Sequence, residues 1–173
     1  MVRADRWDAD DAVTQLYAAH YVGLVRLASL LVRHSGEAEE IVQDAFVSMH
    51  GRWRRLREPD QALAYLRRSV VNKARSAHRH HAVADKHRHR DDDGLRRLEP
   101  SAEDRLLDGE SRRSLLAALE TLPRRQREVL VLRYYSDLSE LDIAATIGIS
   151  RGAVKSHASR GLHSLRTTLE DTR

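Results

Sequence analysis

The most constraining feature of this 173-residue chain is a window that runs from Glu140 to Ser159. Its fifth place holds Ala144, its ninth Gly148 and its fifteenth Val154. In a helix-turn-helix, a small residue lets two helices approach, a glycine takes the turn between them, and a β-branched residue anchors the second helix. The window therefore predicts a helix-turn-helix, a unit that places its second helix in the major groove of DNA.

Serines precede both helices of this unit. We expect Ser139 to cap the first helix and Ser150 to cap the second, because a serine hydroxyl accepts a hydrogen bond from a free backbone N–H at a helix start. In the second helix, Val154 and Ala158 belong to an apolar stripe that faces inward. Small polar and cationic side chains point away from this stripe, as contacts to bases and phosphates require. The candidates for DNA contact there are Arg151, Lys155, Ser156, His157 and Arg160.

The composition favours helices and a polyanionic partner. Charged residues make up 32% of the chain and aromatic residues 5%, with three prolines and eight glycines. A net charge of +4 and a pI of about 9.7 suit nucleic acid. The absence of cysteine excludes disulfides and thiolate metal sites. No apolar run reaches the roughly 18 residues of a membrane span, and the N-terminus shows no signal-peptide core, so we expect a cytoplasmic protein without membrane insertion.

Helical periodicity divides the chain into two blocks. Apolar residues recur at i, i+3, i+4 spacing over 13–31 and 38–49, and a third helix follows from about 61 to 81. Between them, 51–60 is a basic loop closed by a proline. The pattern stops over 82–101, where almost nothing is apolar. The sequence therefore predicts an all-α protein with two small helical domains joined by a flexible linker.

In the second block, periodicity returns at about residue 102 and continues to about 119. Leu122-Pro123 forms a turn, and a further helix is expected over roughly 124–135, before the helix-turn-helix.

The third helix has two opposed faces when its residues are placed at 100° per step. An apolar arc of roughly 80° can pack on the first two helices. The opposite arc carries guanidinium groups mixed with short polar side chains, which can reach base edges as donors and acceptors. The residues of this second candidate DNA surface are Arg68, Asn72, Arg75, Ser76 and Arg79.

No pattern of catalysis or metal binding is present in the sequence. There is no Gly-rich phosphate loop, nucleophile elbow or paired-carboxylate motif, so an enzyme is not expected and no cofactor is implied. Five of the ten histidines lie between His78 and His89, but no pair has i, i+4 spacing and no carboxylate cluster completes a coordination shell. We therefore expect no metal site.

Several segments together identify a family. The chain resembles the bacterial sigma factors of the extracytoplasmic-function (ECF) group, which keep only conserved regions two and four. The resemblance lies in three motifs, in order and at the expected distances: Glu37–Phe46, Ala64–Ser76, and Leu122–Arg133 followed by Leu138-Ser139 and Ala153–His157.

The resemblance implies a protein that binds core RNA polymerase and directs it to promoter DNA. Region two (11–82) would bind the β′ clamp helices through Glu40, Gln43 and Asp44. It would hold the −10 element with the loop 51–60 and the third helix, where Lys73 joins the five residues named above. Residues 83–101 would be the linker.

Region four (102–170) would pack on the β flap and place the recognition helix, with its five candidates, on the −35 element. His157 stands where relatives often carry arginine. The resemblance leaves open an anti-sigma factor as a further partner.

Two other classes of protein remain as alternatives. A LuxR-type transcription regulator has a similar output domain, and residues 121–166 alone do not separate the two. The second is an anti-sigma partner or a plain adaptor that binds only protein. The first 80 residues favour a sigma factor, because they lack an α/β receiver pattern and carry a basic helix with its own polar face.

Overall fold

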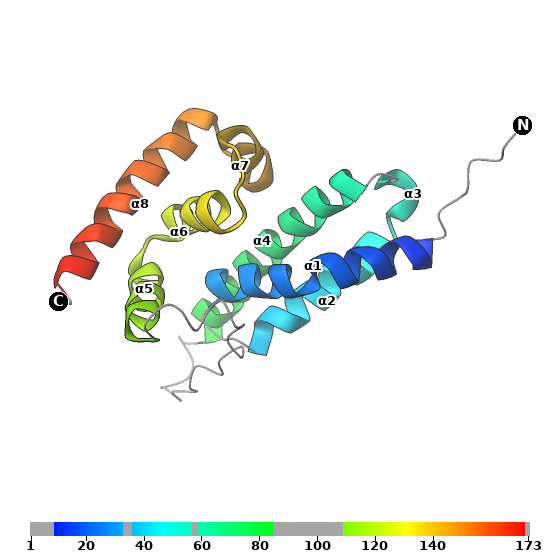
Figure 1. Ribbon diagram of the computed structural model, residues 1–173, viewed down its shortest axis with the longest axis horizontal. Coiled ribbons are helices and arrows are strands. Elements are labelled where there is room, and N and C mark those ends of the chain that lie inside the picture. The colour runs from blue at the N-terminus through cyan, green and yellow to red at the C-terminus, as the bar shows by residue number, and fades with distance from the viewer. Residues whose placement is uncertain (1–8, 33–35, 57–58, 85–108, 172–173) are drawn as a thin grey trace, which may run out of the picture.

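The computed structural model describes residues 9–32, 36–56, 59–84 and 109–171 (Figure 1). All regular elements in these ranges are helices, which confirms the predicted fold class. None of these helices is both long and apolar enough to cross a bilayer.

The first half is a three-helix bundle. Helices α1 (Ala9–Leu31), α2 (Gly36–His50) and α4 (Pro59–Ala84) contact one another pairwise, and the single-turn α3 (Trp53–Leu56) packs on α4. Each long helix turns one apolar stripe inward, as the i, i+3, i+4 spacing predicts. The stripe of α4 that was expected to pack includes Leu66, Val70 and Ala74, and all three are buried.

The boundaries around the basic loop differ from those expected. A short helix, α3, lies inside the predicted loop 51–60. Helix α4 begins at Pro59 rather than near residue 61, because proline lacks an N–H and has a helical φ, which suits the first helical position. Most of the predicted linker and the expected helix start near 102 fall in 85–108, outside the described residues.

The second half contains the helix-turn-helix. Its elements are α5 (Gly109–Thr121), α6 (Arg124–Leu130), the π-helical turn η2 (Val131–Tyr135), α7 (Glu140–Ile147) and α8 (Arg151–Asp171). Gly148 ends α7 with φ of 71°, a left-handed conformation that glycine adopts without a Cβ clash. The predicted turn glycine is thus confirmed.

Both predicted serine caps are present. The Ser139 Oγ accepts a hydrogen bond from the Asp142 backbone N–H at 3.1 Å. The Ser150 Oγ accepts one from the Ala153 N–H, also at 3.1 Å. These bonds satisfy donors that the first turn of each helix leaves free.

The expected helix 124–135 is interrupted by the π turn. Four consecutive apolar residues, 129–132, are all buried there, although one face of an α-helix cannot bury four residues in a row. They are buried because this segment lies between two layers, with α6 against α8 and η2 against α1. The π turn widens the helix where it passes from one layer to the other.

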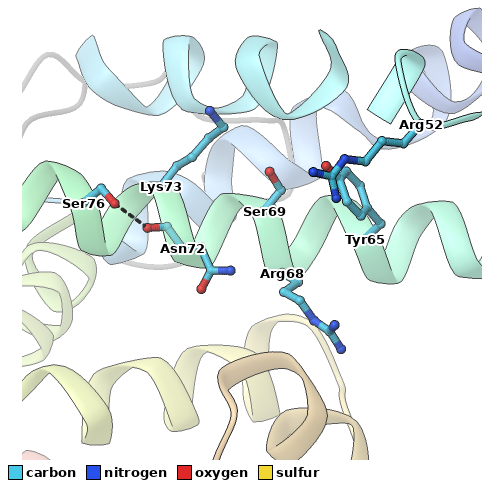
Figure 2. Close-up of a pocket in the computed structure, with 7 residues that line it drawn as sticks. All are labelled: Arg52, Tyr65, Arg68, Ser69, Asn72, Lys73 and Ser76. Carbon is cyan, nitrogen blue, oxygen red and sulfur yellow. Dashed lines mark hydrogen bonds between the residues drawn. The ribbon is translucent and has the colours of Figure 1, made fainter. Parts of the chain in front are cut away.

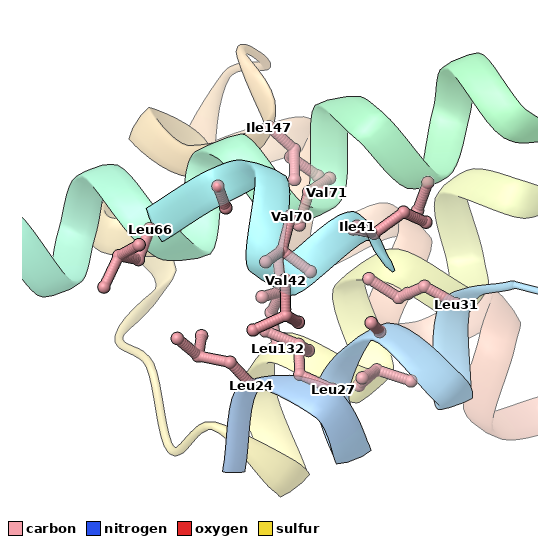
Figure 3. Packing of buried hydrophobic residues seen from close by; sticks show 14 of the residues in the cluster. Leu24, Leu27, Leu31, Ile41, Val42, Leu66, Val70, Val71, Leu132 and Ile147 are labelled. Carbon is pink, nitrogen blue, oxygen red and sulfur yellow. The ribbon is translucent and has the colours of Figure 1, made fainter. Parts of the chain in front are cut away.

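The two halves share one continuous core. Leu132 of η2 is fully buried beside Leu24 and Leu27 of α1, and Ile147 of α7 lies near Val71 of α4 (Figure 3). Burial of one leucine contributes about 1.5–3 kcal/mol, so this seam adds appreciably to stability. The sequence predicted two helical domains but not that they would pack on each other.

Candidate nucleic-acid interface

A hollow of about 410 Å³ lies along α4 (Figure 2). We call it the α4 hollow. It is lined by Arg52, Tyr65, Arg68, Ser69, Asn72, Lys73 and Ser76. Cationic, aromatic and amide or hydroxyl side chains thus surround one space, which is the set that binds phosphate, stacks on a base and recognises base edges.

Four of the six residues predicted to contact the −10 element line this hollow: Arg68, Asn72, Lys73 and Ser76. Asn72 and Arg68 are exposed, and Lys73 and Ser76 are half-buried. Ser76 donates its hydroxyl proton to the backbone carbonyl oxygen of Asn72 at 3.2 Å (Figure 2). This bond does not involve the side-chain amide of Asn72.

Arg52, which belongs to the loop 51–60 expected to hold the −10 element, also lines the hollow. So do Tyr65 and Ser69, which the sequence did not single out individually. The Arg52 guanidinium lies 5.8 Å from the centre of the Tyr65 ring, a cation–π geometry. Tyr65 and Ser69 are one helical turn apart and Asn72 follows Ser69 by three residues, so the i, i+4, i+7 spacing along α4 was an available signal.

Arg75 and Arg79 do not line the hollow. Arg75 faces the second half, where its Nε and Nη2 donate to Oε1 and Oε2 of Glu128, both at 2.7 Å. The side chain of Arg75 is 15% exposed and that of Glu128 is 4% exposed. Arg79 donates from Nη2 to the Ser76 Oγ at 2.9 Å. The structure therefore places one predicted DNA contact, Arg75, in a nearly buried ion pair.

The residues predicted to bind core polymerase share one exposed strip of α2. Glu40, Gln43 and Asp44 are all exposed. Val47 follows on the same side and is 72% exposed, a large apolar side chain that sequence reasoning did not select. We call these four residues the α2 strip.

A contact joins the α2 strip to the α4 hollow. The Lys73 Nζ donates to the Asp44 Oδ2 at 3.2 Å, and the Asp44 side chain is 61% exposed. One predicted polymerase contact thus positions one predicted DNA contact.

On α8, the cationic side chains of the recognition helix gather around one carboxylate. The Oε2 of Glu140 lies 3.8 Å from Lys155 Nζ and 4.0 Å from Arg151 Nη2, and its Oε1 lies 3.5 Å from Arg133 Nη1. Arg151 and Lys155 are 62% and 65% exposed, so both remain accessible to a phosphate or base.

Three further predicted −35 residues lie on the same helix. Ser156 and Arg160 are exposed, whereas His157 is half-buried. Burial lowers the pKa of His157 below its ordinary value of 6.5, and the positive charges of Arg160 and Arg125 add to that effect. The His157 Nδ1 is buried without a hydrogen-bond partner, so this ring is turned further inward than the sequence suggested.

Known proteins identify both halves. The chain matches the family model of sigma-70 region 2 over residues 16–83 and that of sigma-70 region 4 over residues 112–165. The match to region 2 does not favour the LuxR-type alternative, whose likeness lay only in the second half.

Individual relatives agree with these matches. The RNA polymerase sigma-E factor of Streptomyces avermitilis is 33% identical over 147 residues, which cover 85% of this chain and 79% of that protein. The sigma factor CarQ of Myxococcus xanthus is 32% identical over 161 residues, covering 93% and 91%.

Among solved structures, the sigma factor RpoE of Bartonella quintana, in complex with the anti-sigma factor NepR, superposes with a TM-score of 0.74 over 92% of this chain and 98% of that chain. At 23% identity, this likeness supports the shared fold. With two family regions and relatives of matching extent, the chain belongs to the sigma-70 family and is an alternative sigma factor of the extracytoplasmic-function group.

Proposed function

We propose that this sigma factor recognises the −10 element with the α4 hollow and the −35 element with the first half of α8. Sigma factors are transcription initiation factors, so the chemistry of RNA synthesis belongs to the core polymerase. The observation that carries the proposal is the α4 hollow, which Asn72 and Tyr65 of α4 line together with Arg52, whose guanidinium lies over the Tyr65 ring (Figure 2).

The lining of the hollow suits an unstacked base of the −10 element. An aromatic ring and a guanidinium offer flat surfaces for stacking, which contributes about 1–3 kcal/mol per base. The Asn72 amide can pair with a base edge, and Lys73 can contact the backbone phosphate. Extruding a base costs a few kcal/mol, so stacking and backbone contacts together offset that cost.

The N-terminal half of α8 suits the major groove of the −35 element. Its exposed Arg151, Lys155, Ser156 and Arg160 combine charge with small polar groups. Glu140 lies between Arg151 and Lys155 and holds both cations on the groove side of the helix-turn-helix. His157, the fifth predicted contact, is half-buried on the same helix, and burial lowers the pKa of its imidazole.

The α2 strip is the proposed contact to the β′ clamp helices. Glu40 and Asp44 offer carboxylates for arginines of the polymerase, a charge-assisted contact, and Val47 adds exposed apolar area. In this proposal, 11–82 acts as region two and 102–170 as region four, the protein works in the cytoplasm with the polymerase, and an anti-sigma factor, as in the RpoE complex, is a further partner.

Transcription by reconstituted holoenzyme tests the proposal. With core polymerase and promoters found by footprinting, Asn72→Ala is expected to reduce run-off transcript from a native promoter, because one lost base contact costs about 1–3 kcal/mol. It should have little further effect on a promoter whose −10 element is already scrambled. Gln15→Ala, which truncates an exposed amide on α1, is the matched control.

A second pair tests α8. Lys155→Ala should weaken transcription only from promoters with an intact −35 element, whereas Arg166→Ala, an exposed cation further along the same helix, should not. Equal losses for Asn72→Ala or Lys155→Ala on native and scrambled promoters would exclude base recognition by these side chains.

A further inference from the structure

We propose that Glu140 is a specificity-determining residue of the −35 surface on α8, and that its carboxylate directs Arg151 and Lys155 toward base edges rather than phosphates. This inference rests on the proposed role of α8 in −35 recognition. Glu140 acts through the two cations, so it is a positioning residue and not itself a contact to DNA.

The carboxylate of Glu140 lies among three cations from two elements. Glu140 is the first residue of α7, directly after the capping Ser139, and α7 packs on α8 (Figure 1). Its Oε2 faces Lys155 and Arg151 of α8, and its Oε1 faces Arg133 of η2. The Glu140 side chain is 23% exposed, whereas those of Lys155 and Arg151 are 65% and 62% exposed. The carboxylate is therefore more buried than the two cations of α8 beside it.

The three contacts are longer than hydrogen bonds. They measure 3.5 Å to Arg133 Nη1, 3.8 Å to Lys155 Nζ and 4.0 Å to Arg151 Nη2, whereas an N–H···O hydrogen bond spans about 2.7–3.2 Å. The carboxylate thus attracts both cations of α8 without engaging their donor groups in a close bond. Both side chains keep N–H donors for an acceptor on DNA, since ammonium and guanidinium groups carry several.

The charge of Glu140 affects the two kinds of DNA acceptor differently. A phosphate is an anion, so a carboxylate beside Lys155 repels it and competes with it for the same ammonium. The acceptor atoms of a base edge, such as the carbonyl oxygen and ring nitrogen of guanine, are uncharged, so this repulsion is much weaker for them. A repulsion directed at the unwanted contact raises specificity, because specificity is a difference between two affinities. Glu140 is therefore expected to weaken non-specific binding more than −35 binding.

Arg133 keeps the carboxylate in place when the cations of α8 bind DNA. Its Nη1 is the nearest of the three cationic groups to Glu140, at 3.5 Å. Its guanidinium also lies 5.9 Å from the centre of the Tyr134 ring, a cation–π geometry. The half-buried carboxylate thus retains a cationic partner on a separate element after Lys155 and Arg151 move to DNA.

Equilibrium binding by the reconstituted holoenzyme measures this effect. The two ligands are a native promoter duplex and the same duplex with its −35 element scrambled, and the ratio of their affinities is the discrimination ratio. Glu140→Gln should lower this ratio about threefold or more, mainly through tighter binding of the scrambled duplex, because one more cation becomes available to a phosphate. Glu170→Gln removes an exposed carboxylate near the C-terminal end of α8 and should leave the ratio within about twofold of the wild type.

The salt dependence gives a second readout that a purely structural role would not change. On the scrambled duplex, one added phosphate contact should make the slope of log affinity against log salt steeper by about 0.9 for Glu140→Gln, and not for Glu170→Gln. Partial unfolding of a variant lowers both affinities and leaves the discrimination ratio unchanged. Glu140→Asp keeps the charge with a shorter reach, so its ratio should return toward that of the wild type.

A double-mutant cycle tests whether Glu140 acts through the cations of α8. In a chain that carries Arg151→Ala and Lys155→Ala, Glu140→Gln should tighten binding of the scrambled duplex less than it does in the wild-type background. An undiminished effect in that background would overturn the route through these two side chains.

Glu140→Ala replaces Glu140→Gln if the latter folds poorly by circular dichroism, and it should lower the discrimination ratio in the same way. Equal ratios and slopes for the Glu140 and Glu170 variants would overturn the inference and leave −35 recognition standing. A wild-type ratio near one would instead reject the proposed −35 role of α8, and a steeper slope for Glu140→Gln would then support competition with phosphate alone.

Discussion

The close packing of the recognition helix, α8, on α6 predicts that a larger side chain at Gly161 lowers the free energy of unfolding. This residue of α8 is buried against α6. A Cβ added there would lie 3.0 Å from Leu130 Cδ1 and 3.2 Å from Gln126 Cβ. Contacts this short do not persist in a packed interior, so any larger side chain must push α8 away from α6 or displace Leu130.

Gly161→Val is the test substitution and Gly23→Val its control. Both glycines lie inside long helices, but a Cβ at Gly23 meets no atom within 4 Å. Valine forms helices better than glycine by a few tenths of a kcal/mol, and this gain is common to both sites. Overpacking adds a cost of about 1–3 kcal/mol only at Gly161. The difference between the two variants in free energy of unfolding should therefore be about 1–3 kcal/mol.

Urea denaturation of the full chain, followed by circular dichroism, measures this difference. Gly161→Val should have the lower midpoint, with a slope similar to that of the control. If both variants unfold at the same midpoint, the close approach of α8 to α6 does not exist in solution, and the proposed −35 surface must have a different geometry.

The remaining predictions concern the helix-turn-helix. Ser139→Ala should lower the free energy of unfolding by about 1 kcal/mol, because the Asp142 N–H loses its cap, and urea denaturation measures it. Gly148→Ala should cost about 1–2 kcal/mol in the same assay, since alanine is strained at a φ of 71°, and a neutral result would contradict the left-handed turn. For His157, burial and the charge of Arg160 lower the pKa of the folded state below 6.5, so the folded chain binds a proton less readily than the unfolded chain. The wild type should therefore lose stability relative to His157→Gln as pH falls below about 6.5, and a gap that is constant between about pH 7.5 and pH 5.5 would count against this cause.

Local patterns predicted the helices and the helix-turn-helix well. Periodicity marked the buried stripe of α4, including Leu66 and Val70, and cap chemistry marked Ser139 and Gly148. These features depend on neighbours within one or two helical turns, which is the range over which sequence spacing carries structural information. The proline at the start of α4 was interpreted as a loop residue, because proline is compatible with both positions.

Contacts between the halves could not be predicted in this way. Val129 to Leu132 form an apolar run that a sequence pattern assigns to one helix, but not to a segment between two layers with a π turn. Nothing in the apolar period of α1 indicates which of its residues contact Leu132. The shared core depends on how helices that are distant in the sequence fit together in space. A run of apolar residues does not indicate which helix will cover it.

The partner of Arg75 could not be predicted from the sequence either. On a helical wheel it lies among Asn72, Ser76 and Arg79, and a guanidinium on a polar face has the same pattern whether its partner is a phosphate or a carboxylate. Its partner in the structure, Glu128, is 53 residues away in the chain. Glu128 itself follows Arg124 and Arg125, so its sequence context suggests an ordinary exposed helix face rather than a buried acceptor.

The placement of Glu128 gives a physical reason why Arg75 is directed into the seam between the halves rather than toward solvent. A buried carboxylate requires close cationic partners, because desolvation of its charge costs several kcal/mol. With Arg75 at 2.7 Å, Arg125 at 3.1 Å and Arg124 at 3.8 Å, the shortest contacts cross the seam and the next ones do not. The pair therefore links α4 to α6, while the two arginines of α6 add to the compensation of the buried carboxylate.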